Sequence, residues 1–389
     1  MKGQQILVVG GGIAGLTLAI ALTQHGHRVE VIERTPEWKP VGAGIMLQAN
    51  AVAILNALGL REKIESYGFY VSSMQVTDRN GRILSSLDFK ALEAELGPSY
   101  ALHRADLHAS LLNHCAHAAI RMNETVATLA QTENSVTVTF SSGQTATYDF
   151  VVGADGINSQ VRNIALAHNA TPLIYSGYSC WRFVGKNLDN ISAPVEMWGQ
   201  GKRVGVVPLT NGRSYIYMTQ NAPIGEADPV QNRQQAVAAQ FADFQGPAVS
   251  ALGQLDGRKV LVHHDLMELR EPVWGNGRVL LVGDAAHAMT PNMGQGAAQA
   301  IEGALALTIA IDNADNTAQI LPAYKQLHSK RVKKIQARSR QVGRVAQWSN
   351  QIACQTRNWL TRITPQTASQ SNLINTLTPG ISLAQQFNQ

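Results

Sequence analysis

Residues 4–34 read QQILVVGGGIAGLTLAIALTQHGHRVEVIER, and this stretch decides the fold class of the chain. Its first apolar run, residues 6–9, predicts a strand buried on both faces, and a glycine-rich turn and an apolar helix follow at once. A second apolar run, residues 28–32, predicts a parallel strand that ends at Glu33. A strand, a turn, a helix and a second strand in this order predict a βαβ unit and therefore an α/β fold.

The glycines of this turn match the spacing G-x-G-x-x-G of a dinucleotide-binding fingerprint. Gly10 permits the tight turn, Gly12 lets the backbone approach a pyrophosphate, and Gly15 lets the helix pack closely on the strand. Glu33 lies at the end of the second strand, where it can bond ribose hydroxyls. An acid at this position favours the unphosphorylated ribose of FAD or NAD over that of NADP, but the fingerprint alone does not separate FAD from NAD.

Two further glycine-rich turns follow predicted buried strands later in the chain. Residues 278–307, RVLLVGDAAHAMTPNMGQGAAQAIEGALAL, begin as a strand, break at Gly283 and Asp284, and enter an alanine-rich helix. Residues 153–162, GADGINSQVR, likewise place Asp155 just after a strand. A glycine-rich turn at a helix N-terminus favours a ligand with negative charge. Three such turns in one chain indicate a single extended cofactor that is contacted at several points.

A second, β-rich part of the molecule is predicted between these turns. Residues 69–90 and 171–271 contain runs that alternate like antiparallel strands. Such a sheet would cover one face of the cofactor and create a substrate pocket at the interface of two lobes. The chain after residue 318 reads as helical and then as irregular, because Pro365 and Pro379 interrupt it.

The bulk composition of the chain limits its class. Its 389 residues are 45% apolar, which is enough for two lobes. No apolar run reaches the ~18–20 residues that a membrane span needs, and the first residues lack the layout of a signal peptide, so we expect a cytoplasmic protein. Cys115, Cys180 and Cys354 lie far apart and are expected to be free thiols. The adjacent His263 and His264 would point to opposite faces of a strand, so we expect no metal site there.

The charge of the chain is uneven. The formal net charge is +5, yet residues 316–389 contain ten Lys and Arg and no acid, so the first 315 residues carry 22 − 27 = −5. A basic tail is typical of a nucleic-acid partner or of an anionic membrane surface. We favour a C-terminal helix that packs on the acidic body, because apolar residues recur in the tail at helical spacing. No nucleic-acid partner is expected.

The three turns resemble those of class A single-component FAD-dependent aromatic monooxygenases, the family typified by para-hydroxybenzoate hydroxylase. The motifs GGGIAG at 10–15, GADGINSQVR at 153–162 and GDAAHAMTPNMGQG at 283–296 agree with the family in order, spacing and residues, and the resemblance covers nearly the whole chain. It implies a Rossmann-type FAD-binding domain, an interleaved β-sheet substrate domain and C-terminal helices. The expected divisions are 1–70, 100–170 and 272–320 for the discontinuous FAD-binding domain, 71–99 and 171–271 for the substrate domain, and 321–389 for the C-terminal helical segment.

The resemblance also implies roles for individual residues around FAD. The first motif and Glu33 would hold the adenosine end, Arg104 would lie near the flavin, and Asp284 would bond the ribityl hydroxyls. Backbone N–H groups of residues 294–297 would meet the pyrimidine edge of the flavin, which is anionic when reduced. The full set of expected cofactor contacts is Gly10, Gly12, Ala14, Gly15, Glu33, Arg34, Gly44, Arg104, Val126, Asp155, Gly283, Asp284, Pro291, Gly294, Gly296 and Ala297.

The chemistry implied by the resemblance is hydroxylation of a small aromatic or heteroaromatic compound. NADH or NADPH would reduce the flavin, O2 would give a flavin C4a-hydroperoxide, and its terminal oxygen would attack an electron-rich carbon. A second G-x-G-x-x-G is absent from the sequence, so the nicotinamide donor is expected to bind transiently. The protein is expected to be a monomer or a homodimer.

The substrate side is less specific in the sequence. Arg203 and Tyr215 are similar in placement to the arginine and tyrosine of urate hydroxylases in this family, and Arg182 and Pro291 complete the candidate catalytic set. A strand arginine and a core tyrosine without a substrate role remain an equal alternative. The sequence departs from the family at two places. Ala49 stands where many relatives have proline, and Gly303 follows Glu302 where relatives usually have Asp.

Rival functions remain open at this level. One is hydroxylation or epoxidation of a larger polycyclic compound, either antibiotic-inactivating or biosynthetic. Another is a flavin reductase that does not oxygenate, and a non-enzymatic rival is a degenerate flavin-binding protein or a membrane-tethered partner. The intact first motif, Asp155 and Asp284 argue against degeneration. Flavin halogenase is disfavoured, because the Trp-x-Trp-x-Ile-Pro signature is absent from the sequence.

Overall fold

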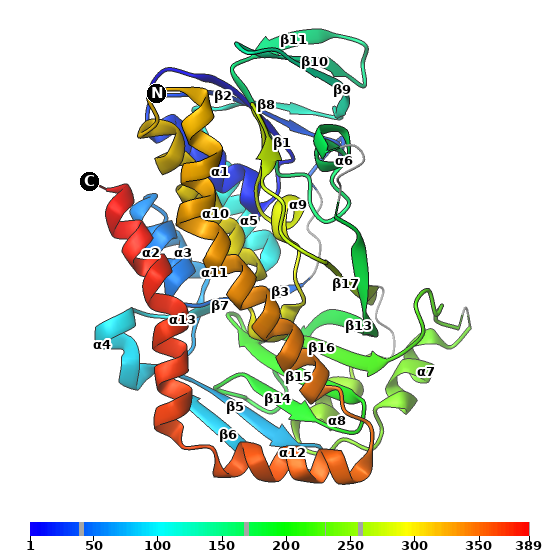
Figure 1. Ribbon diagram of the computed structural model, residues 1–389. Coiled ribbons are helices and arrows are strands. Elements are labelled where there is room, and N and C mark those ends of the chain that lie inside the picture. The colour runs from blue at the N-terminus through cyan, green and yellow to red at the C-terminus, as the bar shows by residue number, and fades with distance from the viewer. Residues whose placement is uncertain (39–42, 167–170, 230, 256–259, 389) are drawn as a thin grey trace.

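The computed structural model describes residues 1–38, 43–166, 171–229, 231–255 and 260–388. A six-stranded, mostly parallel sheet lies at one end of the molecule (Figure 1), in the order β18-β19-β12-β1-β2-β8. The order brings β1, β12 and β19 side by side, so the turns that follow these three strands lie at one edge of the sheet. The strands are β1 (Gln5–Val9), β2 (Arg28–Glu33), β8 (Ala119–Met122), β12 (Phe150–Gly153), β18 (Gly275–Asn276) and β19 (Val279–Leu281).

A seven-stranded sheet forms the other end, in the order β17-β13-β16-β15-β14-β5-β6. It joins the hairpin β5–β6 to five strands that follow much later in the chain, and this explains why the sequence of the two lobes is interleaved. Neighbouring strands are antiparallel except β14 and β5. The strands are β5 (Ser73–Asp78), β6 (Ile83–Asp88), β13 (Leu173–Lys186), β14 (Val195–Trp198), β15 (Lys202–Leu209), β16 (Arg213–Asn221) and β17 (Val262–Leu269).

The two faces of this sheet differ in character because side chains alternate along each strand. Phe183, Val204, Ile216 and Met218 lie on one face and form an apolar cluster with helices α7 (Arg233–Gln240) and α8 (Pro247–Leu252). The opposite face therefore carries the intervening residues of β13, β15 and β16, many of which are polar. This polar face is turned toward the parallel-sheet end of the molecule.

Two small antiparallel sheets complete the β-structure. One lies beside the parallel sheet and consists of β9 (Val126–Gln131), β10 (Val136–Phe140) and β11 (Thr145–Tyr148). The other pairs β7 (Tyr100–His103) with β3 (Gly44–Leu47) on one side and β4 (Phe69–Tyr70) on the other, and it lies between the two large sheets (Figure 1).

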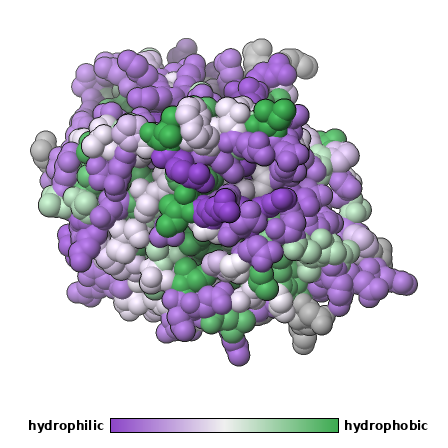
Figure 2. Space-filling model, turned by 90° about the horizontal axis from the view of Figure 1, so that it is seen from below, coloured by the Kyte–Doolittle hydropathy of each residue, from purple (hydrophilic) through white to green (hydrophobic). Residues whose placement is uncertain are grey.

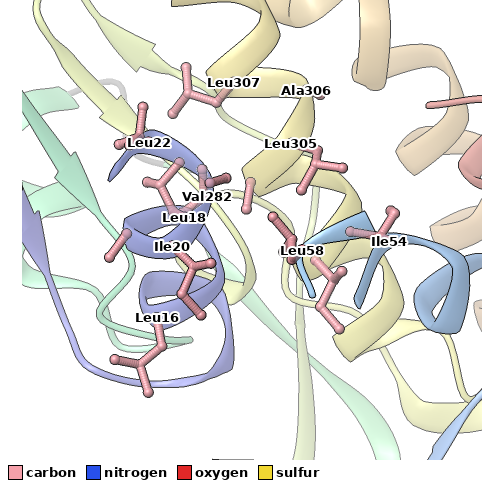
Figure 3. Close-up of a cluster of buried hydrophobic side chains, with 14 of the residues drawn as sticks. Leu16, Leu18, Ile20, Leu22, Ile54, Leu58, Val282, Leu305, Ala306 and Leu307 are labelled. Atoms are coloured by element: carbon pink, nitrogen blue, oxygen red, sulfur yellow. The ribbon is translucent and has the colours of Figure 1, made fainter. Parts of the chain in front are cut away.

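The main core lies where α1 (Ile13–Gln24) packs against α10 (Gly296–Asp312) and near α2 (Ala49–Ala57). Helix α1 is apolar on nearly all sides because the parallel sheet and neighbouring helices enclose it. Figure 3 shows side chains of this core that converge from the three helices and from the end of β19: Leu16, Leu18, Ile20, Leu22, Ile54, Leu58, Val282, Leu305, Ala306 and Leu307. The shorter helices here are α3 (Arg61–Tyr67), α4 (Glu93–Leu96), α5 (Arg104–His114), α6 (Gln160–Leu166) and α9 (Asp284–His287).

The C-terminal segment forms three helices. Helix α11 (Thr317–Ala346) runs from the parallel-sheet end to the seven-stranded sheet, α12 (Gln351–Ile363) crosses the far end, and α13 (Gln366–Phe387) returns to α2 (Figure 1). The expected irregular tail is therefore wrong. Helix α13 continues through Pro379 because Leu377, Leu383 and Phe387 are buried, and this packing outweighs the hydrogen bond that proline removes. None of the described helices is long and apolar enough to cross a membrane.

Candidate active site

The three glycine-rich turns meet at the edge of the parallel sheet. Gly10 has φ +107°, and a Cβ atom at this position would lie 2.6 Å from the Ala154 carbonyl oxygen. A Cβ atom at Gly283, where φ is +59°, would lie 2.7 Å from the Cβ of Ala14. Contacts this close mean that the protein itself requires glycine at both positions. The turns that the sequence predicted separately are thus one structural unit.

Two glycines of the motifs have no such structural requirement. A Cβ atom at Gly12 or at Gly296 would have no atom of the described residues within 4 Å, and neither residue has a positive φ. Gly12 is the N-cap of α1 and Gly296 begins α10, and no side chain caps either helix. By contrast, a Cβ atom at Gly15 would lie 1.9 Å from the Gly10 carbonyl oxygen. Open space in front of two uncapped helix N-termini fits an extended ligand with negative groups.

The adenosine end expected from the sequence is centred on Glu33. Its carboxylate accepts hydrogen bonds from the backbone N–H groups of Gly11 (2.9 Å) and Thr35 (3.0 Å), and Arg34 beside it is exposed. The ring of Trp38 covers Gly11, a contact that the sequence motif did not predict. Val126 is fully buried among apolar side chains, and its contact with the cofactor stays a prediction.

The carboxylate of Asp284 is exposed to solvent but closely surrounded by protein. Its side chain is exposed although Gly283 and Ala285 beside it are buried, and the surrounding protein desolvates the carboxylate and raises its pKa. The positive charge of Arg104 opposes this rise in the pKa of Asp284, which means that the two side chains lie within electrostatic reach. Arg104 itself is exposed at the start of α5. A solvent-accessible acid and a cation in a confined space are suited to the polar middle of a bound cofactor.

The second motif joins its own helix to the third motif. Asp155 accepts hydrogen bonds from the backbone of Gln160 (2.7 Å) and Val161 (3.1 Å), so its carboxylate caps α6. Arg162 is buried and donates to the carbonyl oxygens of Ile157 (2.7 Å) and Ala285 (3.1 Å). A ligand contact of Asp155 remains a prediction, whereas the side chains of this motif fix the relative position of the turns.

The loop before α10 is exposed on one side and supported on the other. Pro291 and Gly294 are exposed, and Gly294 has φ +62°. Behind the loop, Gln48 donates to the Met293 carbonyl oxygen (3.1 Å) and accepts from Gln295 (2.6 Å). This amide network fixes the backbone of the loop, so that its N–H groups and those of Gly296 and Ala297 keep their direction.

The polar face of the seven-stranded sheet meets this loop and β3. A Cβ atom at Gly44 would lie 2.3 Å from the Cβ of Tyr215, so Tyr215 packs directly on the backbone of β3. Arg203 donates from Nη2 to the side-chain oxygen of Asn292 at 2.8 Å, immediately after Pro291. The structure thus brings the predicted cofactor and substrate residues together.

Each of the three side-chain nitrogens of Arg203 bonds a protein group. Arg203 is 2% exposed, its Nε donates to Thr219 (3.2 Å) and Gln347 (3.1 Å), and its Nη1 pairs with Glu196 (3.3 Å). Glu196 also accepts a hydrogen bond from Tyr217. The predicted direct contact of Arg203 with substrate is not tested by these contacts, but they give the side chain a clear positioning role.

Tyr215 and Arg182 differ from Arg203 because their polar groups are available. Both are half-buried, and among the described residues no group hydrogen-bonds the Tyr215 hydroxyl. Burial raises the pKa of Tyr215, while the charges of Arg182 and Arg104 lower it. The three predicted residues therefore lie close enough to interact electrostatically. Arg182 donates from Nε to the sulfur of Cys180 at 3.3 Å. A donor hydroxyl beside two cations is suited to a ring oxygen that carries negative charge.

Comparison with known proteins identifies the family. A model of the FAD binding domain matches residues 4–339. The chain is 35% identical over 379 residues to 2-heptyl-3-hydroxy-4(1H)-quinolone synthase of Pseudomonas aeruginosa, covering 97% of this chain and 98% of the relative. It is 32% identical over 369 residues to aurachin C monooxygenase/isomerase of Stigmatella aurantiaca, covering 93% and 94%. The chain belongs to the class A FAD-dependent aromatic monooxygenases.

A solved structure of this family has the same fold. HpxO of Klebsiella pneumoniae, crystallised with FAD and uric acid, superposes with a TM-score of 0.89 at 25% identity, covering 97% of both chains. The predicted architecture, an α/β FAD-binding domain with further sheets and C-terminal helices, is confirmed. The enzyme class and the cofactor are also confirmed by the matching family model, by the relatives and by the solved structure with FAD. The open space at Gly12 and Gly296 and the accessible Asp284 fit this cofactor.

The structure shows the surroundings of Glu302 and Gly303, where the sequence predicted a departure from the family. Glu302 is buried and accepts hydrogen bonds from Asn50 (2.6 Å) and Arg331 (2.8 Å). A Cβ atom at Gly303 would lie 3.2 Å from both His328 and Tyr324, so a larger side chain would crowd these rings. The acid at 302 thus acts within the protein, behind the loop, and its sequence position alone could not reveal its partners.

His264, which the sequence raised only as a rejected metal ligand, lies on the same sheet face as Arg182. It lies opposite Cys180 in the sheet, and its side chain is exposed. Partial desolvation of the imidazole and the charge of Arg182 lower the pKa of His264. His263 on the other face stacks on Trp181 with ring centroids 4.5 Å apart. The opposite directions of the two histidines follow the alternation that the sequence predicted, yet only the sheet register shows that His264 faces Arg182.

Proposed function

We propose that this monooxygenase hydroxylates a planar bicyclic nitrogen heterocycle at a carbon beside a ring carbonyl or enol oxygen, using NADH or NADPH and O2. The names of two groups of relatives, a quinolone synthase and urate hydroxylases, share this substrate chemistry. The observation that carries the proposal is the available Tyr215 hydroxyl next to the charge of Arg182.

FAD, when bound, supplies hydride acceptance and oxygen activation, which no side chain of the protein can provide. The protein's own contribution is to bind and to orient. The N-terminus of α10 at Gly296 stabilises negative charge on a bound group, and Asp284 accepts hydroxyl hydrogen bonds. The raised pKa of Tyr215 keeps its hydroxyl protonated near neutral pH, so it donates a hydrogen bond to the ring oxygen of the substrate.

Arg182 has a separate role in this proposal. Its charge stabilises the enolate form of the substrate, which raises electron density at the adjacent carbon and makes that carbon reactive. Arg203 acts through Asn292, because it is buried and each of its side-chain nitrogens already bonds a protein group. We therefore assign Arg203 a positioning role and reserve substrate contact for Arg182, Tyr215 and Pro291.

We also propose a domain division of the chain and a cellular location for the enzyme. Residues 71–99 and 171–271 are proposed as the substrate-binding domain, in support of which β5 and β6 share one sheet with the five strands of the second segment. We place the enzyme in the cytoplasm, where NADH and NADPH are available to a cofactor site open to solvent.

The test is a screen of NADH and NADPH oxidation by the purified yellow protein against 4-quinolones, purines, aromatic acids and tetracycline-like polycycles. We expect a quinolone or purine to accelerate oxidation and to yield a product heavier by one oxygen atom. Acceleration only by polycycles would favour the rival function with a larger substrate. Oxidation that no compound accelerates would contradict the proposal.

A further inference from the structure

Helix α12 presents an apolar stripe to solvent. Ile352, Trp359, Leu360 and Ile363 are 73%, 57%, 47% and 53% exposed. Their spacing of seven, eight and eleven residues after the first places all four on one side of the helix. Figure 1 shows α12 at the end of the molecule farthest from the parallel sheet, and Figure 2, which looks onto this end, shows apolar residues among polar ones.

The other side of α12 is firmly anchored. Arg357 is 2% exposed and donates to the carbonyl oxygens of Ala346 (2.8 Å) and Gly199 (3.1 Å). Its guanidinium also lies over the Trp198 ring, 5.1 Å from the centroid. The Asn350 side chain caps the helix through the backbone of Ala353 at 3.1 Å. These contacts fix the rotation of α12, so the apolar stripe cannot turn inward to escape water.

The charge around the stripe indicates what covers it. No acid occurs between residues 316 and 389, whereas this segment contains ten Lys and Arg. Arg344 in the last turn of α11 and Arg362 in the last turn of α12 are exposed. Most of these cations lie on α11, and Arg357 of α12 is buried, so Arg344 and Arg362 are the exposed cations that flank the stripe. A helix face with Trp, Ile and Leu beside exposed arginines is typical of helices that lie in the interface of an anionic bilayer.

A second copy of the chain is a poorer occupant. Four partly exposed side chains on one short helix fall short of the ~800 Å² per partner that a stable protein interface buries. Two copies that met through α12 would also bring like charges together. A phospholipid surface has neither difficulty, because it attracts the cations and has no fixed shape to match.

We propose that α12 docks this protein on an anionic phospholipid surface, with Ile352, Trp359, Leu360 and Ile363 inserted among the headgroups. Helix α12 packs against β6 of the seven-stranded sheet, so docking brings that sheet next to the lipid. The attachment is peripheral. The inference does not depend on the identity of the substrate, because it concerns a surface outside the site.

The test is co-sedimentation of the FAD-loaded protein with vesicles of phosphatidylcholine alone or mixed with phosphatidylglycerol. We expect binding to the mixed vesicles that weakens with salt and is much weaker with phosphatidylcholine alone. The triple variant Ile352→Gln, Leu360→Gln, Ile363→Gln should bind at least about tenfold more weakly, because the buried apolar area drives insertion.

The matched control is the triple variant Leu188→Gln, Ile224→Gln, Val249→Gln, whose apolar side chains are 55%, 61% and 55% exposed outside α12. It should bind like the wild type, and flavin content should be unchanged in both variants. Trp359 fluorescence, obtained as the difference from Trp359→Phe, should shift to shorter wavelength with mixed vesicles. Equal losses in both triple variants, absence of wild-type binding, or a wild-type dimer that only the α12 variant loses would overturn the proposal.

Discussion

On the cofactor side of the active site, the decisive features belong to the backbone, while on the substrate side they belong to side chains. Gly12 and Gly296 leave open space at two helix N-termini, and the protein needs little else there to receive a negative ligand. Across the site, Arg203 and Tyr215 lie on one sheet face but have opposite states, one occupied by four protein groups and one available. Residue type alone therefore does not distinguish a side chain that supports the site from one that is available to contact substrate.

The largest expected effect is within the cofactor side. Gly15→Ala should lower the free energy of unfolding by at least about 3 kcal/mol, because the new Cβ would lie 1.9 Å from the Gly10 carbonyl oxygen and the backbone must move. Gly12→Ala and Gly296→Ala should change it by less than about 1 kcal/mol, because the new Cβ meets no atom in the part of the chain that the structure describes. Both should still weaken FAD binding about tenfold or more, since the added methyl group enters the ligand's space.

Chemical unfolding of the flavin-free proteins and FAD titration measure these two quantities separately. If Gly12→Ala and Gly15→Ala lost stability equally, the open space at Gly12 would not be a ligand site. If Gly12→Ala bound FAD like the wild type, the same conclusion would follow.

The next effect separates the two arginines of the substrate side. Arg203→Met should destabilise the protein by about 3 kcal/mol, because it leaves Glu196 buried without its cation. Arg182→Met should cost less than about 1 kcal/mol, since its one hydrogen bond to the described residues is to the sulfur of Cys180. Thermal unfolding measures the stability of the two variants. Turnover measures their activity, and Arg182→Met should lose most of its activity while it retains FAD. Equal destabilisation by both variants would remove the distinction between them.

A smaller effect is expected from the tyrosines of β16. Tyr215→Phe should leave FAD binding unchanged and reduce kcat by roughly tenfold, because the hydroxyl donates to the substrate. Tyr217→Phe is the matched control on the same strand: it should lower stability by about 1 kcal/mol through the lost bond to Glu196 and change kcat little. Steady-state kinetics with saturating donor test both. Full activity of Tyr215→Phe would exclude the proposed contact.

The smallest effect concerns Asp284 and has a defined pH dependence. Its pKa is raised in the folded protein, so the ionised carboxylate weakens the flavin-free fold as pH rises from the unfolded-state pKa through the folded-state pKa. Asp284→Asn should therefore melt slightly higher than the wild type near neutral pH and equally at acid pH. FAD retention should fall in the same variant. A melting temperature below that of the wild type at neutral pH would contradict the desolvation argument.

The cofactor side could be predicted from the sequence because backbone geometry demands particular residues. Only glycine fits at Gly10, Gly15 and Gly283, so the strand–turn–helix units and their meeting at one sheet edge follow from local patterns. The fold class was predicted correctly for this reason. The enzyme class and FAD were also predicted correctly, but they came from the resemblance of the three motifs to a known family.

The substrate side could not be predicted to the same depth. The partners of Arg203 include Asn292 and Gln347, which are 89 and 144 residues away and lie in the loop before α10 and just after the end of α11. No local pattern reports such contacts, and the same holds for the packing of Tyr215 on Gly44. The irregular tail was predicted wrongly because Pro379 has a strong local preference, whereas burial along α13 depends on α2.

The most direct test of the account is isotopic labelling of the product. The FAD-loaded protein is given NADH or NADPH, a 4-quinolone or purine that accelerates donor oxidation, and ¹⁸O₂. We expect one labelled oxygen atom to enter the product at a carbon beside the ring oxygen. Tyr215→Phe and Arg182→Met should reduce the amount of labelled product while they retain FAD. Oxidation of the donor with all oxygen recovered as hydrogen peroxide, and no label in any compound of the panel, would contradict the account.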